Sequence, residues 1–405
     1  MLEILNSTHA VSPDLQKKCQ DALSLFMQKK LVGFPDLPLR LHLWTSTSEV
    51  GAWARENFKD LVVIGIGGSS LGARAIVEAM NVTNVHFLDN VDPIEYARVL
   101  ARLKSFESTC FAAISKSGTT IETLCAIEFL EQDFSKKGLT LKDRTVVITE
   151  NKESSLLHWA KEHKLKTLEV PLDVGGRFSV LSPVGMFVAS FAGLSIDGFK
   201  LGATEALNDR ATVSQLMGHF VESFSREEWI TLFWFYSSPM KNFGLWIQQL
   251  WAESLAKTKT KAGAPAPRVS TPMMALGAVD QHSILQQVME GTKDKFVVFV
   301  RVAACEGGSE KLAASQFKET SLLVNRPMGA LLSAEAQATQ AGLEKNGVST
   351  LGIRTKGLSE ENLGYLFMAF QLVVAGLGEY LEIDAFDQPG VELGKRLAKD
   401  ILLKA

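Results

Sequence analysis

The sequence predicts an α/β protein built from two doubly wound domains, each a parallel sheet flanked by helices. Short apolar runs of strand length alternate with stretches of helical length, first from about residue 60 and again from about residue 229. These runs are continuously apolar, which is typical of strands that are covered on both faces. The 405 residues are enough for two domains of ordinary size.

An amphipathic helix is expected first, because Ser12 supplies an N-cap and Pro13 suits the first helical position. The first set of strands then follows. Four apolar runs predict strands, and the stretches between them have the pattern of helices: 61–66, 85–88, 110–114 and 144–149.

The second set has two clear strand candidates and a weaker one: 230–236, 295–302 and 350–354. Helical patterns lie between and after them: 241–257, 281–290, 333–345, 360–377 and 391–403. The resulting organisation has five parts. We expect an N-terminal helical segment, a first domain, a helical bridge, a second domain and a C-terminal helix, with bounds of 1–45, 46–185, 186–228, 229–385 and 386–405.

Composition restricts the function. A net charge of −3 argues against a global basic surface for nucleic acid or an anionic membrane. The most hydrophobic runs, 186–194 and 366–377, are shorter than the roughly 20 residues that a membrane-spanning helix needs. No signal peptide is recognised. The cysteines lie far apart, which argues against disulfides or a zinc site and favours the cytoplasm: Cys19, Cys110, Cys125 and Cys305.

The segment VVIGIGGSSLG, residues 62–72, passes from a predicted strand through glycines and serines into a helix. Such a turn lets backbone N–H groups and the helix N-terminus approach an anion. Gly65 and Gly67, followed by Asp89 after the next apolar run, also mimic a dinucleotide-binding fingerprint. This motif alone leaves sugar-phosphate binding, NAD binding and a structural turn open.

A second such turn is AISKSGTTIET, residues 113–123. Four hydroxyl side chains lie next to Lys116, whereas a helix cap needs only one: Ser115, Ser117, Thr119 and Thr120. This density suits a phosphomonoester. The segment is not a Walker loop, because the GxxxxGK[ST] pattern is absent.

Other candidates are single residues. Arg177 follows a Gly-Gly turn, from which an arginine can stabilise anionic charge. Gln249 and Glu253 are four apart on one helix face among tryptophans, where burial would favour a general base. His282 lies at a loop-to-helix junction, and Lys395 follows a Gln-Pro-Gly turn. Alone, each is also compatible with a structural or surface role.

Taken together and in order, these segments resemble the glucose-6-phosphate isomerase (phosphoglucose isomerase) family. GGRFSVLSPVG resembles its first signature, and GLGEYLEIDAFDQPGVELGK its second. IGIGGSSLG and SKSGTTIET resemble its two sugar-phosphate loops, and QQLWAES its catalytic-glutamate segment. The resemblance covers residues 60–400 and implies two sugar-isomerase (SIS) domains. It further implies a homodimeric enzyme of glycolysis and gluconeogenesis, without metal or cofactor, that interconverts D-glucose 6-phosphate and D-fructose 6-phosphate through a cis-enediol.

The resemblance also implies individual roles. Glu253 would move the proton between C2 and C1, and Arg177 would stabilise the charge of the intermediate. Lys395 and His282 would open the pyranose ring, with the histidine contributed across the dimer interface. The phosphate and the sugar would be held by the remaining residues: Ser69, Ser115, Lys116, Ser117 and Thr120 for the phosphate, Gly176, Gln249 and Gln388 for the sugar, and Gly68 for the substrate or its phosphate.

Three alternatives remain at this stage. A dual phosphoglucose/phosphomannose isomerase is disfavoured by the complete second signature. A non-catalytic sugar-phosphate sensor would keep the loop at 115–120 but need not keep Glu253, Arg177 and Lys395, all of which are present. An NAD-dependent oxidoreductase would leave SKSGTT and the C-terminal signature without a role.

Overall fold

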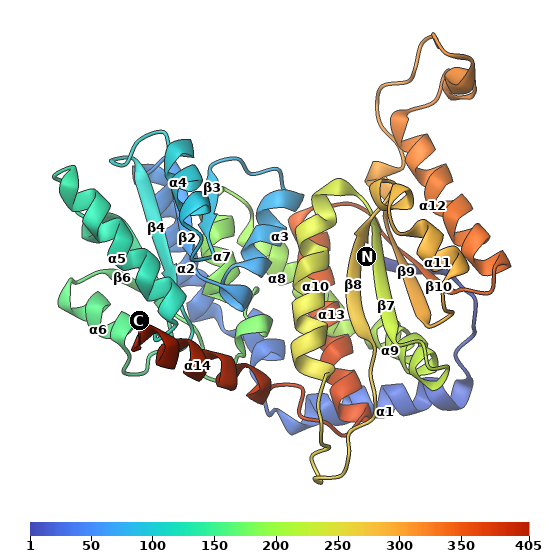
Figure 1. Cartoon of the computed structure of the whole chain (residues 1–405), viewed down its shortest axis with the longest axis horizontal. Coiled ribbons are helices and arrows are strands. Elements are labelled where there is room, and N and C mark those ends of the chain that lie inside the picture. The colour runs from blue at the N-terminus through green and yellow to red at the C-terminus, as the bar shows by residue number, and fades with distance from the viewer. Residues whose placement is uncertain (405) are drawn as a thin grey trace.

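The computed structural model describes residues 1–404, the side chain of Glu392 excepted. It contains two five-stranded sheets with helices packed on their faces (Figure 1). The first sheet is parallel throughout and has the order β3-β2-β4-β5-β6. Its strands are β2 (Asp60–Ile64), β3 (Val85–Leu88), β4 (Thr109–Ile114), β5 (Thr145–Thr149) and β6 (Lys166–Glu169). The predicted α/β class with parallel sheets is confirmed.

The second sheet has the order β1-β10-β9-β7-β8. Four of its strands are parallel: β7 (Ile230–Tyr236), β8 (Thr271–Leu276), β9 (Lys295–Val302) and β10 (Ser349–Thr355). The fifth, β1 (Leu2–Ser7), pairs antiparallel with β10 at the edge. The prediction of a helical segment over 1–45 is therefore wrong for these first residues. Their six-residue run has no strand signal of its own, and its partner lies more than 300 residues away in the chain.

The helices that surround the sheets are α1 (Pro13–Lys29), α2 (Leu41–Asn57), α3 (Leu71–Ala79), α4 (Pro93–Arg102), α5 (Ile121–Lys136), α6 (Ser155–Glu162), α7 (Pro183–Phe191), α8 (Ile196–Asn208), α9 (Arg210–Ser225), α10 (Lys241–Leu255), α11 (Leu285–Glu290), α12 (Met328–Lys345), α13 (Glu360–Tyr380) and α14 (Glu392–Leu402). Short 3-10 turns include η2 (Gly67–Ser69), η4 (Gly176–Phe178) and η6 (Val279–His282).

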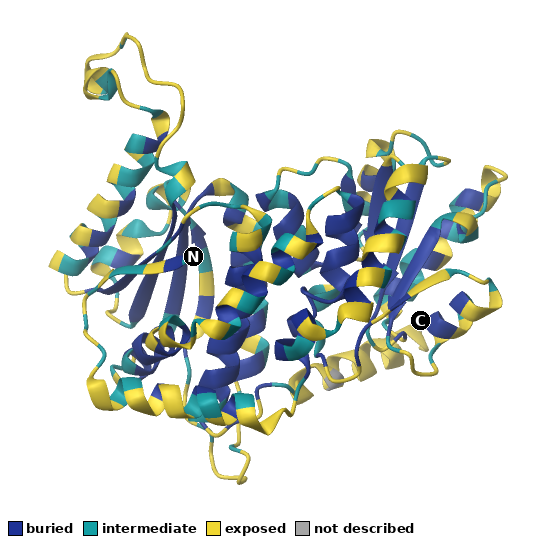
Figure 2. Ribbon diagram, turned by 180° about the vertical axis from the view of Figure 1, so that it is seen from behind, coloured by how far each residue is buried: buried dark blue, intermediate teal, exposed yellow. Residues whose placement is uncertain are grey.

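Helix α13 forms the centre of the molecule. Its 21 residues have the length and composition of a membrane span, and it is longer than the sequence pattern predicts. However, 89% of its most apolar window is buried inside the protein, against α8, α1, α9 and α10. Figure 2 shows the inner strands of both sheets mainly in the buried colour. The apolar surface of α13 is therefore buried in the core between the two sheets.

The connection order of the first sheet creates a ligand-binding position. The chain passes from β2 to β3 on one side and then returns to β4 on the other. In open α/β sheets the crevice at such a reversal, outside the carboxyl ends of the strands, is the usual ligand site. Both hydroxyl-rich loops begin there, because one follows β2 and the other follows β4.

Helix α10 brings the second half of the chain to this position. It packs along α3 of the first half, between the two sheets (Figure 1). The backbone N–H of Asn242 at its start donates to Oε2 of Glu78 on α3, at 3.0 Å. Residues projecting from α10 can therefore meet the loops of the first sheet.

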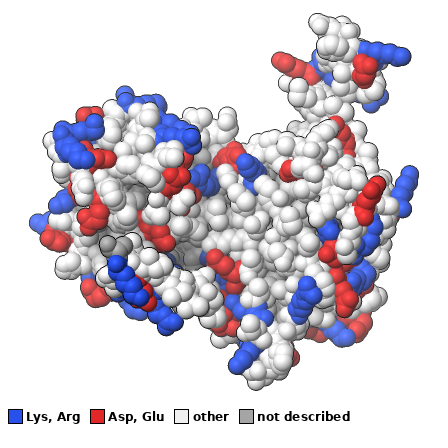
Figure 3. All heavy atoms as spheres, in the orientation of Figure 1, with Lys and Arg blue, Asp and Glu red and all other residues white. Residues whose placement is uncertain are grey.

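Charge is distributed evenly on the face shown in Figure 3. Basic and acidic side chains are interspersed over both halves of that face. On this face, positive charge is therefore supplied by individual cations that lie among acidic side chains.

Candidate active site

The loop after β4 gathers hydroxyl groups in front of helix α5. Ser115 is buried, and its Oγ lies 2.8 Å from Oγ1 of Thr120 and accepts from the N–H of Gly118 at 3.1 Å. Ser117 Oγ lies 3.1 Å from Oγ1 of Thr119. Thr120 is the N-cap of α5 but makes no side-chain cap hydrogen bond. The first N–H groups of α5 are thus available to an anion, together with the hydroxyls.

Lys116 adds a positive charge to this loop. Its Nζ lies 3.2 Å from Oε1 of Glu150, which follows β5. The Lys116 side chain is 33% exposed, so it can also reach a bound anion. A phosphate here would share the lysine with Glu150.

The loop after β2 contacts the turn that carries Arg177. A Cβ atom added to Gly68 would lie 2.4 Å from the carbonyl carbon of Gly176, so only glycine allows this approach. Gly67 has a φ of +60°, and a Cβ there would lie 2.9 Å from Nε2 of Gln249. The two glycines therefore place the first loop directly against Gly176 and α10. Ser69 belongs to the same 3-10 turn, η2.

Arg177 is the centre of the site. Only 4% exposed, it donates to five acceptors from two distant segments. These are Ser254 Oγ (2.7 Å), Glu253 Oε2 (3.5 Å), Gln388 Oε1 (3.1 Å), Ala385 O (2.7 Å) and Asp387 O (3.0 Å). Burial lowers the pKa of Arg177, and the nearby carboxylates, Glu253 first, act in the opposite direction. A guanidinium in such surroundings stays charged.

Glu253 lies beside Arg177 with its carboxylate partly open. Oε1 accepts a hydrogen bond from Nε2 of Gln249 at 3.0 Å, and the side chain is 29% exposed. Trp246 and Trp251 on the same helix are buried. The carboxylate is therefore oriented by two donors and still accessible to a ligand. Oε1 of Gln249 is buried without a hydrogen-bond partner among the described residues.

Two further predicted residues lie on exposed segments. Lys395 lies on α14, which starts shortly after Gln388 and is exposed. His282 lies in η6 after β8 and is exposed too. Among the contacts of the described residues, none joins His282 to Glu253 or Arg177. One subunit thus brings together Gly68, Gly176, Arg177, Gln249, Glu253 and Gln388, but not His282.

Sequence reasoning missed two residues here, Ser254 and Lys257. Ser254 is fully buried and accepts from Nε of Arg177. Lys257 contacts the segment that carries Gln388. The spacing of four residues between Glu253 and Lys257, which would place both on one face of the predicted helix 241–257, was the available signal.

Asp89, the acidic residue of the dinucleotide-like pattern, already forms an ion pair within the protein. Asp89 receives two hydrogen bonds from Arg74, at 2.5 and 2.8 Å, and the Arg74 guanidinium also covers the ring of Phe87. In a dinucleotide site the corresponding carboxylate binds a ribose. The internal ion pair favours the sugar-phosphate interpretation of this loop over NAD binding.

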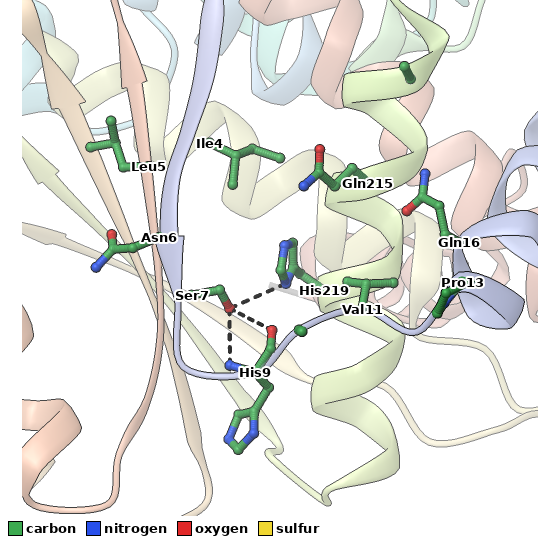
Figure 4. Close-up of a pocket in the computed structure, with 12 residues that line it drawn as sticks. Ile4, Leu5, Asn6, Ser7, His9, Val11, Pro13, Gln16, Gln215 and His219 are labelled. Carbon is green, nitrogen blue, oxygen red and sulfur yellow. Dashed lines mark hydrogen bonds between the residues drawn. The ribbon is translucent and has the colours of Figure 1, made fainter.

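A separate hollow of about 690 Å³ lies between β1, α1 and α9 (Figure 4). Ser7 Oγ lies 3.3 Å from Nδ1 of His219, which suggests a nucleophile and its base. However, the Ser7 hydroxyl also contacts the carbonyl oxygens of His9 and Thr350, at 3.0 and 3.2 Å. Burial lowers the pKa of His219 to about 4, which makes it a weak base. The Ser7–His219 pair is therefore best explained as a structural link between β1 and α9.

Comparisons with known proteins identify a matching family and several relatives. The family model described as phosphoglucose isomerase matches residues 39–405. A glucose-6-phosphate isomerase of Thermus thermophilus is 35% identical over 380 residues, covering 91% of this chain and 89% of that one. Another, from Rubrobacter xylanophilus, is 33% identical over 393 residues, covering 90% and 88%.

Solved structures agree with the fold. A hypothetical protein from Thermus thermophilus superposes with a TM-score of 0.87 at 32% identity, over 99% of this chain and 100% of that one. A glucose-6-phosphate isomerase from Chlamydia trachomatis superposes with a TM-score of 0.81 at 22% identity, over 96% and 85%.

Proposed function

This chain belongs to the phosphoglucose isomerase family, and on that premise we propose how its residues carry out the reaction. The enzyme interconverts glucose 6-phosphate and fructose 6-phosphate, an aldose–ketose isomerisation of glycolysis and gluconeogenesis. The observation that carries the residue roles is the convergence of Glu253, Gln249, Arg177 and Gln388 beside the glycine loop that follows β2.

Glu253 is the base that moves the proton between C2 and C1. A base for this step must be ionised, oriented and accessible to substrate. Hydrogen bonding to Gln249 orients the carboxylate, and its 29% exposure leaves room for a ligand. The unpartnered Oε1 of Gln249 suits a sugar hydroxyl, which would satisfy this buried acceptor.

Arg177 stabilises the negative charge that develops on the cis-enediol intermediate. Its guanidinium is buried and fixed by five acceptors, so little reorganisation is needed when charge develops nearby. Gly176 and Gln388 line the sugar beside it, and Gly68 contacts the substrate at the adjoining loop.

Ser69, Ser115, Lys116, Ser117 and Thr120 hold the phosphate. The hydroxyls at 115–120 and the uncapped start of α5 supply donors that match phosphate oxygens, and Lys116 supplies charge. The phosphate would thus be anchored at the first sheet while α10 presents Glu253 to the sugar carbons.

Removing phosphate donors should mainly weaken binding. We expect Ser115→Ala and Lys116→Ala to raise KM for fructose 6-phosphate with a smaller change in kcat, because phosphate contacts are shared by ground and transition states. Steady-state kinetics measures the split. A loss confined to kcat would contradict the phosphate assignment.

Lys395 and His282 open the pyranose ring, and His282 comes from the partner subunit of a homodimer. Its exposed position on η6, apart from Glu253 in the same subunit, is compatible with this arrangement. These roles need a base, an oxyanion stabiliser and a ring-opening acid–base pair, so we propose no metal or cofactor.

We also propose a cytoplasmic location and the domain division predicted above, with β1 counted in the second domain.

Mixing two inactive variants tests the shared site. His282→Ala and Glu253→Gln homodimers should each have low activity. After exchange of subunits, half of the dimers are mixed, and each mixed dimer has one site with both native residues. Activity should then rise to about a quarter of the wild-type value, as random pairing of two subunits requires. Absence of recovery, with exchange verified by mass spectrometry, would place His282 in the same subunit as Glu253.

A coupled assay tests the reaction itself. The purified protein should convert fructose 6-phosphate to glucose 6-phosphate at the same rate with and without a chelator. Loss of activity on chelation that added metal restores would contradict the metal-free mechanism. The same preparation offered mannose 6-phosphate decides whether the enzyme is also a phosphomannose isomerase.

A further inference from the structure

Lys257 is a buried lysine next to the site that the reaction roles above do not use. It lies just beyond the end of α10, and its side chain is 8% exposed. Its Nζ donates to the carbonyl oxygens of Glu253 (2.9 Å) and Asp387 (2.6 Å), and lies 2.8 Å from Oδ1 of Asp387. The ammonium group therefore joins the last turn of α10, the catalytic helix that carries Glu253, to the C-terminal segment that contains Asp387.

The same segment is also held by Arg177. The carbonyl oxygen of Asp387 accepts from both Lys257 and Arg177, and Ala385 O accepts from Arg177 as well. Between these two residues, the ring of Phe386 packs against that of Phe178, with centroids 5.3 Å apart. Residues 385–388 are thus fastened to two cations, and Gln388 reaches Arg177 from the end of this segment.

We propose that Lys257 is a positioning residue that fixes residues 385–388 against the catalytic helix. In this way it sets the place of Gln388 on Arg177 and the point from which α14 departs toward Lys395. The proposal rests on the roles proposed above for Glu253 and Arg177. It assigns Lys257 no contact with the substrate.

The physical argument concerns the two carbonyl oxygens that accept hydrogen bonds from Lys257. The last carbonyls of a helix have no partner within the helix, and a cation there is favourable. Without the ammonium, the carbonyls of Glu253 and Asp387 each lose a charge-assisted hydrogen bond. The Asp387 carboxylate is 51% exposed and can be solvated instead, so the backbone contacts matter most. Loosening this segment displaces a hydrogen-bond partner of Arg177, and small displacements in an active site are costly.

The test compares Lys257→Met with a matched control, Lys261→Met. Lys261 lies in the same loop, and its ammonium pairs with Glu379 at 2.9 Å rather than with residues 385–388. With fructose 6-phosphate, we expect Lys257→Met to lower kcat about tenfold or more. The control should stay within about twofold of wild type, as expected for loss of a partly exposed ion pair.

Three further measurements separate positioning from general damage. The inhibition constant of inorganic phosphate should change less than about twofold in Lys257→Met, because the phosphate loop at 115–120 is untouched. Asp387→Asn should have a smaller effect than Lys257→Met, because it keeps both carbonyl contacts. Amide hydrogen exchange over residues 385–390 should speed up in Lys257→Met and not in the control.

Unchanged kcat in folded Lys257→Met would overturn the proposal, as would equal losses in the two lysine variants or a parallel loss of phosphate inhibition. If Lys257→Met does not fold, Lys257→Gln, which keeps one donor group, is judged by the same criteria. Failure of the isomerase assignment would be distinct, since wild-type protein would then not turn over fructose 6-phosphate at all.

Discussion

Replacing Glu253 by glutamine is expected to lower kcat by about 10³-fold or more, the range associated with losing a general base. Glutamine has nearly the same shape, so substrate should still bind at the phosphate loop and in the sugar pocket. It cannot accept the proton from C2 or C1. Coupled kinetics gives kcat and KM, and incorporation of solvent deuterium into the sugar reports the proton transfer directly.

Glu222→Gln is the matched control for this substitution. Glu222 lies on α9 and pairs with Arg226 at 3.3 Å, away from the cluster around Arg177. Its kcat should equal that of wild type. Near-normal kcat or deuterium incorporation in Glu253→Gln would mean that another group is the base.

Replacing Arg177 by lysine should have the second largest effect, lowering kcat by about 10²- to 10³-fold, as for removal of an oxyanion-stabilising donor. Lysine keeps one positive charge but lacks the planar fork that reaches Ser254, Gln388 and the two carbonyls at once. The charge therefore remains near the intermediate without its fixed position. Measurement of kcat together with the substrate dissociation constant separates this effect from loss of binding.

Arg74→Lys is the appropriate control, because it also breaks a bidentate contact, with Asp89, but at the far side of the first loop. It should keep kcat within about threefold of wild type, the usual range for a partly exposed ion pair. A mild effect of Arg177→Lys, or equal effects of the two substitutions, would contradict the role of Arg177.

Much of the fold is predictable because buried parallel strands have a strong local signature. Strands β2, β4, β5, β7 and β9 are almost continuously buried and were recognisable as apolar runs. Of the four strands at sheet edges, β3 was predicted as the run 85–88, whereas β1, β6 and β8 were missed. β6 is the short, mostly exposed run KTLE, and β8 contains Pro272, which is tolerated only at an edge.

The site residues also divide into those that have a clear local signal in the sequence and those that lack one. Motif chemistry and family resemblance named Arg177, Glu253 and the hydroxyl loop without any coordinates. They did not name Ser254 or Lys257, because a buried serine and a lysine after a helix are ordinary in sequence. Their importance arises only from partners far away in the chain, such as Asp387, which is 130 positions from Lys257.

The sequence by itself determined the periodicity of each element and the chemical groups available to the reaction, since both are properties of neighbouring residues. Tertiary structure alone decided that Arg177 contacts residues 76 and 211 positions away. It also decided that Asp89 is occupied by Arg74 and that the C-terminal segment is held by two cations. Hydrogen bonds act over about 3 Å, and which distant groups come within that range depends on how the two sheets and α10 pack together.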